Sequence, residues 1–158
     1  MRRWIGEMPA KGKETNSVEL TFPDLSKKKY RKGITPLEVA NDIGPRLAAD
    51  AIAAKLDGLT VDLKSPVEKD SKFEVLTFDS KEGKEVLRHS AAHILAHAVT
   101  ELYPKALPTI GPAVEDGFYY DFDMNPVSSD DLGKIEARMN EIIKADLPSK
   151  RIVISKKQ

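Results

Sequence analysis

All three histidines of the chain stand in one stretch, HSAAHILAHAV, as His89, His93 and His97. A spacing of four residues places successive imidazoles on one face of an α-helix. Imidazole exchanges protons near neutral pH, so neighbouring rings suit general acid–base catalysis, in which one ring orients a water or hydroxyl and the other holds a proton. This stripe is the first candidate for a functional site.

A metal site is the other chemistry open to these rings. Helical rise separates His89 from His97 by about 12 Å, whereas a zinc–nitrogen bond is near 2 Å, so the three rings cannot bind one ion together. One neighbouring pair could bind zinc with ligands from elsewhere, but the chain has no cysteine and no further histidine. Metal-free acid–base chemistry by a pair of these imidazoles is therefore preferred.

A helical projection of residues 85–103 tests whether the histidines lie on the apolar face that would pack in a hydrophobic core. With Glu85 at zero, the rings fall near about 40°, 80° and 120°, while the bulky apolar residues occupy roughly 180° to 320°. A histidine that only fills a core normally lies inside the apolar arc. A solvated face and the floor of a cleft remain as alternatives, and the small neighbours Ser90, Ala96 and Thr100 favour the cleft.

The elements ahead of this helix follow an order of strands around one helix that is typical of the β-grasp arrangement. Alternating apolar and polar residues indicate half-buried strands, and glycine and proline mark the turns. The predicted elements are a strand from Val18, a strand around Tyr30, a helix begun by Thr35 and Pro36 and ended by Gly44-Pro45, a hairpin with Asp57-Gly58 at its turn, and a strand over residues 72–78.

A domain boundary is predicted near residue 80, because DSKEGK, residues 79–84, is polar and contains a glycine, as linkers often do. We expect a flexible tail over residues 1–17 and domains over 18–79 and 80–158. The second domain is predicted to contain a helix over 85–103 ended by Pro104, strands and a turn at Asp116-Gly117 within 109–124, a helix capped by Ser128 or Ser129 and broken by Leu147-Pro148, and a strand over 151–155.

Composition limits the class of protein. A content of 41% hydrophobic residues in 158 allows one medium domain or two small ones, and no apolar stretch is long enough for a membrane span or a secretory signal, so a cytoplasmic location is expected. Without cysteine, disulfides and thiolate chemistry are excluded.

Charge is distributed unevenly along a chain whose net charge is zero. Residues 1–33 hold nine basic against four acidic residues, and residues 115–146 hold three against nine. The run KKKYRK, residues 27–32, is interpreted as a solvated face, with contact to a nucleic-acid backbone as the alternative.

Two adjacent segments carry a family resemblance. RHSAAHILAHAVTELYP followed by PTIGPAVEDGFYYDFDM is similar to the start of the editing domain of bacterial-type threonyl-tRNA synthetases. The preceding FPDLSKKKYRKGITPLEVANDIGPRLAADAIAAKLDG resembles the TGS domain that opens the same enzymes and has a β-grasp fold. The resemblance implies an α+β chain, a β-grasp TGS domain followed by a partial α+β editing domain with a long histidine-bearing helix.

The resemblance also implies roles. In that family the editing domain hydrolyses serine wrongly attached to threonine tRNA, because one methyl group discriminates by only about 1 to 3 kcal/mol. His89 and His93 correspond to its histidine motif, whereas Gly111 and Tyr120 correspond to substrate-binding positions near the terminal adenosine and seryl group. Hydrolysis is expected to be water-mediated and to need no metal, and His97 is expected to be supportive only.

The later half of the family's editing pocket and the aminoacylation core, with its zinc and ATP sites, have no counterpart in these residues. We therefore expect an N-terminal piece of such a synthetase, whose partners are tRNA and the remainder of the chain, whose parent enzyme is a homodimer, and which needs no cofactor in this segment. A freestanding trans-editing hydrolase and a noncatalytic TGS adaptor that binds RNA or a protein are the alternatives.

Overall fold

The computed structural model describes residues 16–148, 152, 154 and 155. The chain divides into two compact units, Met1–Phe78 and Asp79–Gln158, and each is described by itself. Both units combine helices with strands, as the predicted α+β class requires. The predicted tail lies outside the described residues except for Asn16 and Ser17, and Ser17 is already part of the first strand.

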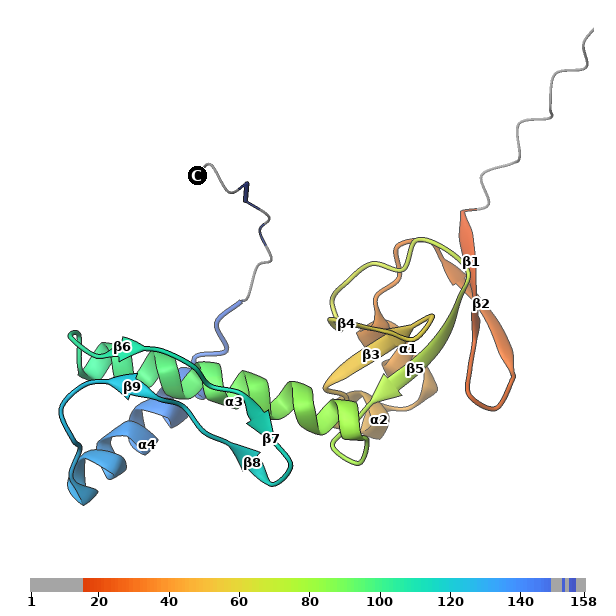
Figure 1. Ribbon diagram of the computed structural model, residues 1–158. Helices are drawn as coiled ribbons and strands as arrows, with labels where there is room; N and C mark the ends of the chain where they lie inside the picture. Colours follow the sequence, from red (N-terminus) through yellow and green to blue (C-terminus); the bar gives the residue numbers. More distant parts are fainter. Residues whose placement is uncertain (1–15, 149–151, 153, 156–158) are drawn as a thin grey trace, which may run out of the picture. The chain divides into compact units, whose positions relative to one another are not determined.

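The first unit is a five-stranded sheet with two short helices (Figure 1). The strands follow the order β2-β1-β5-β3-β4, in which β1 and β5 run parallel and the other neighbours antiparallel. This order, with a helix between the first two strands and the later ones, is the predicted β-grasp arrangement. The elements are β1 Ser17–Thr21, β2 Lys27–Arg31, α1 Pro36–Ile43, α2 Pro45–Asp50, β3 Ala53–Leu56, β4 Leu59–Val61 and β5 Ser71–Leu76.

Helix α1 begins where the sequence predicts. The Thr35 hydroxyl accepts from the Glu38 backbone N–H at 3.3 Å, while the Glu38 carboxylate accepts from the Thr35 N–H at 2.8 Å. This reciprocal capping box satisfies backbone donors that the first helical turn leaves free. The same bonds, with the Arg31 guanidinium, hold the pKa of Glu38 below its ordinary value.

The prediction that Gly44-Pro45 ends the helix begun by Thr35 and Pro36 is confirmed, but the sequence did not predict the helix that follows. Gly44 does end α1, but Pro45 opens a second helix, α2. The first position of a helix has no intrahelical N–H bond to lose, so a proline suits it.

Alternation along the strands of the first unit separates a buried from a polar face. Val18 and Leu20 of β1 and Phe73 of β5 are at most 2% exposed and pack with the buried α1 residue Val39. Leu20 is paired with Ser71 and Val18 with Tyr30, so these residues share the face that α1 covers. The core therefore consists of the alternating apolar residues that the sequence pattern identifies.

The second unit is two helices and a β-ribbon (Figure 1). Its longest element is α3, and α4 packs against it through Val99, Ile135 and Ile142. Among the described residues, no helix combines the length and apolar character needed to cross a bilayer. The elements are α3 Lys81–Leu102, β6 Leu107–Pro108, β7 Ala113–Val114, β8 Gly117–Phe118, β9 Phe122–Asp123 and α4 Ser129–Lys144.

The prediction of a linker over residues 79–84 is wrong, because most of these residues belong to α3. Ser80 is the N-cap of α3, and its hydroxyl accepts from the Gly83 N–H at 3.0 Å, so the helix begins at Lys81 rather than near residue 85. A serine cap with Glu82 in the first turn is a helix-start signal, which the polar composition concealed.

Residues 107–123 fold back on themselves as one ribbon. β6 pairs with β9 at its base and β7 with β8 at its tip. Between the two ladders, the Thr109 N–H donates to the Asp121 carbonyl at 3.0 Å and the Asp121 N–H to the Ile110 carbonyl at 2.9 Å. The turn at the tip is Glu115-Asp116, one residue earlier than predicted, since Gly117 already pairs with Val114.

The end of the chain differs from prediction as well. Ser128 caps α4 by a capping box with Asp131, as one of the two predicted alternatives, and α4 ends at Lys144. The predicted strand over residues 151–155 lies partly outside the described residues, and its described members Ile152, Ile154 and Ser155 are not in a strand.

Candidate functional site

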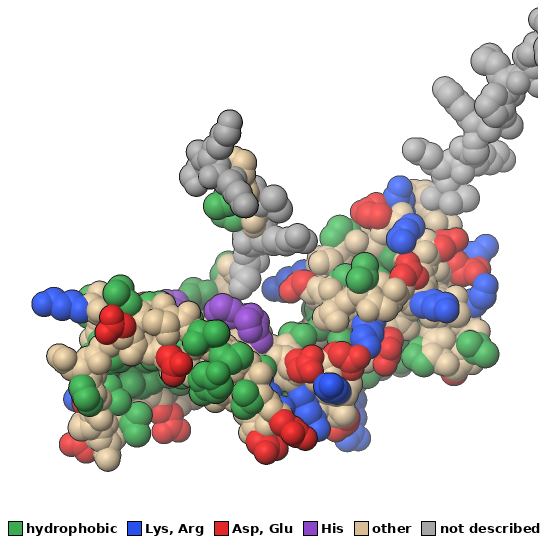
Figure 2. Space-filling model, in the orientation of Figure 1, with side chains coloured by type: hydrophobic (Ala, Val, Ile, Leu, Met, Phe, Trp, Pro, Cys, Tyr) green, Lys and Arg blue, Asp and Glu red, His purple; other side chains and the backbone are tan. Residues whose placement is uncertain are grey.

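The histidine stripe lies on the exposed side of α3. His89 and His93 are exposed, whereas Ala92, Ala98 and Val99 on the opposite side are almost completely buried. Histidine side chains are accordingly visible at the surface in Figure 2. The apolar arc of α3 packs only in part, since Val99 is buried but Leu87 and Leu102 are exposed. The exposure of His89 and His93 excludes the interpretation of these two histidines as core residues.

His89 and His93 contact each other directly. Their Nε2 atoms are 3.0 Å apart, and the ring planes are nearly perpendicular, at 89°, with centroids 4.5 Å apart. Two imidazole nitrogens at this distance form a hydrogen bond in which one donates and the other accepts. The structure thus brings the two predicted catalytic side chains together as a pair.

His97 has a different environment. Its Nε2 lies 3.3 Å from the Glu101 carboxylate, which in turn accepts from Arg138 Nε of α4 at 2.7 Å. Arg138, followed by His97, lowers the pKa of Glu101. Of these two contacts, only the Arg138–Glu101 pair connects α3 to α4, because His97 and Glu101 both lie on α3. His97 therefore contacts the residue that joins the helices and is not part of the pair formed by His89 and His93.

Gly111 and Tyr120, the two predicted substrate-binding residues, face each other across the ribbon. A Cβ atom on Gly111 would lie 2.1 Å from Cδ2 of the Tyr120 ring, so only glycine lets the ring lie flat on the backbone here. The ring also stacks on Phe122, with centroids 4.8 Å apart. The structure thus brings the two predicted substrate-binding residues together, in a close approach that the sequence did not indicate.

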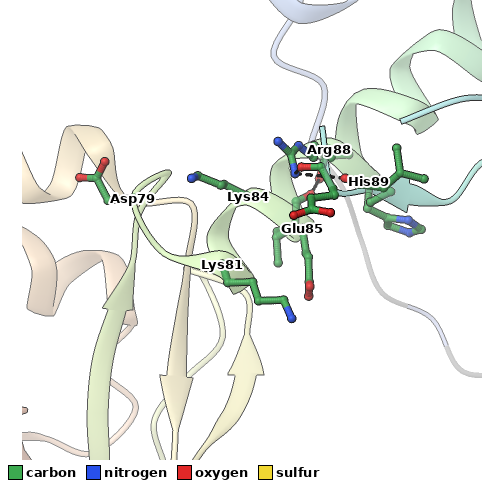
Figure 3. Close-up of a pocket in the computed structure, with 11 residues that line it drawn as sticks. Asp79, Lys81, Lys84, Glu85, Arg88 and His89 are labelled. Carbon is green, nitrogen blue, oxygen red and sulfur yellow. Dashed lines mark hydrogen bonds between the residues drawn. The ribbon is translucent and has the colours of Figure 1, made fainter. Parts of the chain in front are cut away.

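A cavity of about 1070 Å³ opens between the first turns of α3 and the tip of the ribbon (Figure 3). Charged residues of both signs line its helix side, among them Lys84, Glu85, Arg88 and His89. Of the four predicted site residues, only His89 lines this cavity. The other three lie outside its described lining, and no described contact joins the histidine pair to Gly111 and Tyr120.

Arg88 is a residue that the sequence reasoning missed. Its Nη1 donates to the Val114 carbonyl at 3.1 Å and also to the Glu115 carbonyl. It connects α3 to a segment 26 and 27 residues away, directly beside His89 (Figure 3). The available signal was its place on the helix, about 100° from His89 and at the border of the apolar arc.

The basic run KKKYRK is largely neutralised within the first unit. Four of its cations lie within 4.0 Å of carboxylates, in the pairs Lys27–Glu19, Lys28–Asp42, Arg31–Glu38 and Lys32–Glu68. The Tyr30 hydroxyl also donates to Asp42 at 2.8 Å, and burial, together with this carboxylate, raises the pKa of Tyr30 to about 12. Cations engaged in this way favour the solvated-face interpretation over nucleic-acid contact.

Among residues 16–148 and the described residues beyond them, no group of three or more histidine, cysteine, aspartate or glutamate side chains could hold a metal ion. The arrangement that the structure does provide is a hydrogen-bonded imidazole pair on an exposed helix face, next to a cavity and a ribbon.

Comparison with known proteins gives the family context of this β-grasp domain and of the histidine-bearing helix and ribbon that follow it. Residues 18–77 match the TGS domain family. The chain is 51% identical to the threonine–tRNA ligase of Hyphomonas neptunium over 140 residues, which are 88% of the chain. It is 49% identical to the threonine–tRNA ligase of Symbiobacterium thermophilum over 142 residues. The chain spans only 21% and 22% of the length of these two relatives.

The first unit of this chain is therefore a TGS domain. The chain as a whole is homologous to the N-terminal region of threonine–tRNA ligases, which confirms the resemblance of both segments.

Proposed function

We propose that this chain acts as the N-terminal region of a threonine–tRNA ligase and that its second unit contributes His89 and His93 to an editing site that hydrolyses seryl-tRNA. The observation that carries the proposal is the hydrogen-bonded pair of imidazoles, 3.0 Å apart, on an exposed face of α3. The relatives' name supplies the context of threonine attachment to tRNA. Both tRNA and the rest of the ligase are then partners of this chain.

The histidine pair suits ester hydrolysis. One imidazole accepts a proton from water as the water oxygen attacks the seryl carbonyl carbon, and the carbon–oxygen bond to the terminal ribose then breaks. The leaving ribose oxygen takes up a proton, which a neighbouring imidazole can supply. A hydrogen-bonded pair of imidazoles can serve both steps, because one ring can accept a proton while the other donates one.

Gly111 and Tyr120 suit the binding of the terminal adenosine and seryl group. The Tyr120 ring is half-buried between Gly111 and Phe122, which gives a rigid aromatic surface with a polar hydroxyl. A rigid wall is needed because the site must distinguish serine from threonine, which differ by one methyl group.

The remainder of the proposed ligase would complete the site. Of sixteen exposed large hydrophobic side chains among the described residues, four belong to the first unit and twelve to the second. Figure 2 shows hydrophobic side chains gathered on the unit that holds the histidines. Apolar surface of this extent is typical of an interaction face. ATP and zinc would belong to the aminoacylation core outside this chain, and we infer a homodimeric whole enzyme from the family alone.

The test is clearance of seryl-tRNA by the whole ligase with His93→Ala. Loss of a general acid or base typically slows a reaction by about 10² to 10⁴-fold, so seryl-tRNA should persist while threonine attachment continues. His97→Ala is the matched control, since His97 belongs to the same stripe but pairs with Glu101. Normal clearance of seryl-tRNA by the His93→Ala ligase would contradict the proposal and would leave the pair as part of a solvated face.

The isolated chain separates the proposal from its alternatives. We expect little hydrolysis of seryl-tRNA by the 158 residues alone. Robust hydrolysis would favour a freestanding trans-editing hydrolase. A whole protein that binds RNA but neither charges nor edits tRNA would favour a TGS adaptor.

A further inference from the structure

We propose that Arg88 is a positioning residue of this site: it holds the tip of the ribbon, residues 107–123, against α3 and so sets the place of Gly111 and Tyr120 relative to the histidine pair. The inference rests on the proposed editing function and goes beyond it, since it assigns a role to a residue outside the histidine motif. It follows from three features of the second unit.

The first feature is the bond itself. Arg88 Nη1 donates to two successive carbonyls, those of Val114 and Glu115, at the turn between β7 and β8. Hydrogen bonds from a charged donor are about twice as strong as neutral ones. A two-residue ladder such as β7 with β8 is too short to be stable alone, so its place depends on α3, on which both strands pack and from which Arg88 donates these bonds.

The second feature is that the ribbon is held at two ends. At its base, Ala106 is 5% exposed in the core formed with α4, and β6 follows directly. At its tip, the ribbon packs on α3 through β7 and β8 and accepts hydrogen bonds from Arg88 of that helix. Gly111 and Tyr120 lie between these anchors, in the part of the ribbon joined by backbone bonds of Thr109 and Ile110 to Asp121. Their position therefore depends on both ends.

The third feature is the cavity. His89 lines it from α3, and Ala113 and Val114 line it from the ribbon, with Arg88 joining the two sides (Figure 3). Arg88 directly precedes His89, so the same helical turn carries the imidazole and the clamp. Without the guanidinium, the width of the cavity beside His89 is no longer fixed.

The first arm of the test measures hydrogen exchange in the 158-residue chain. In Arg88→Met, which keeps the length of the side chain but not its donors, the Asp121 amide, which donates to the Ile110 carbonyl, should exchange about tenfold faster, while amides near Val99 keep their protection. Arg88→Lys should restore part of the protection, because an ammonium can donate to a carbonyl. Lys81→Met, which removes a cation from the same cavity, should leave the ribbon unchanged.

The second arm measures seryl-tRNA hydrolysis by the whole ligase. A displaced binding wall with intact histidines should raise KM about tenfold in Arg88→Met and leave kcat within about twofold, the opposite of the kcat loss expected for His93→Ala. The KM of Arg88→Lys should lie between the KM of the unsubstituted ligase and that of Arg88→Met.

Each outcome has one meaning. Unchanged ribbon exchange in Arg88→Met overturns the clamp, and a loosened ribbon with unchanged KM reduces Arg88 to a purely structural residue. If the unsubstituted ligase fails to hydrolyse seryl-tRNA, the proposed function itself fails, and the positioning role fails with it.

Discussion

Nε2 of His89 and Nε2 of His93 lie 3.0 Å apart, with the two rings nearly perpendicular. Each neutral imidazole carries its proton on one of two nitrogens, so this contact requires one ring to present an Nε2–H and the other a bare Nε2. Two rings of identical type, one helical turn apart, are thereby made chemically unequal. That inequality distinguishes an acid–base pair from two independent surface histidines.

The first prediction follows directly. At about pH 8.5, where free imidazole is neutral, one ring of the pair should be the Nε2–H tautomer and the other the Nδ1–H tautomer. Long-range ¹H–¹⁵N correlation spectra of the chain measure this. His97 is the internal reference, expected as Nε2–H because its Nε2 faces Glu101. The same tautomer in His89 and His93 would contradict the contact.

The second prediction concerns Gly111. Gly111→Ala places a Cβ 2.1 Å from the Tyr120 ring, so the ring must leave the backbone and the ribbon must distort. We expect a loss of about 1 to 3 kcal/mol in the unfolding free energy of the second unit, typical of overpacking. Gly117→Ala is the matched control, since a Cβ there meets no atom within 4 Å. Chemical unfolding followed by Tyr fluorescence compares the two, and equal effects would refute the close approach.

The third prediction concerns acid. Lys134 first, and then Ser128, lower the pKa of Asp131 at the start of α4. The native state therefore binds fewer protons than the unfolded state, whose aspartates titrate near pH 4. The stabilisation is present above that pH and is lost as the pH falls through the lower native pKa.

In Asp131→Asn, the unfolding free energy of the second unit should therefore decrease less steeply as the pH falls below about 4. Denaturant unfolding between pH 3 and pH 7 measures the slope. Asp130→Asn is the control in the same helical turn, and the two variants should differ, because the described cap bonds are made by Asp131.

The fourth prediction is that residues 16–78 fold independently. Their core is formed within the unit, with Leu20 and Phe73 almost fully buried. This segment should melt cooperatively, and Leu20→Ala should cost about 2 to 5 kcal/mol. Leu59→Ala is the matched control: Leu59 is 73% exposed, so its loss should cost little. A non-cooperative melt would contradict an autonomous TGS domain.

The fifth prediction concerns the second unit alone. Because twelve of the sixteen exposed large hydrophobic side chains that are described belong to it, residues 79–158 should bind a hydrophobic dye and self-associate. Sedimentation and dye fluorescence test this beside residues 16–78. A monomer that binds no dye would contradict the prediction that this exposed apolar surface is an interaction face.

The local elements of this protein could be predicted because their signals are short-range. Thr35 and Glu38 stand three residues apart and form the expected capping box, and the four-residue spacing of His89 and His93 places them in contact on α3. The linker prediction failed for a related reason. Polar residues suit both a linker and an exposed first helical turn, and the Ser80 cap decides between them.

The sequence by itself determined the strands of the first unit, helices α1 and α4, and the spacing that pairs the two histidines, since hydrophobic period, caps and turn residues act within a few positions along the chain. It did not predict α2 or the start of α3. Only the tertiary structure decided that Arg88 reaches carbonyls 26 and 27 residues away, that the Tyr120 ring lies on Gly111, and that the basic run of β2 is paired with carboxylates. Such contacts depend on how elements pack across distance in the chain, and no local periodicity encodes which side chain a packed neighbour will meet.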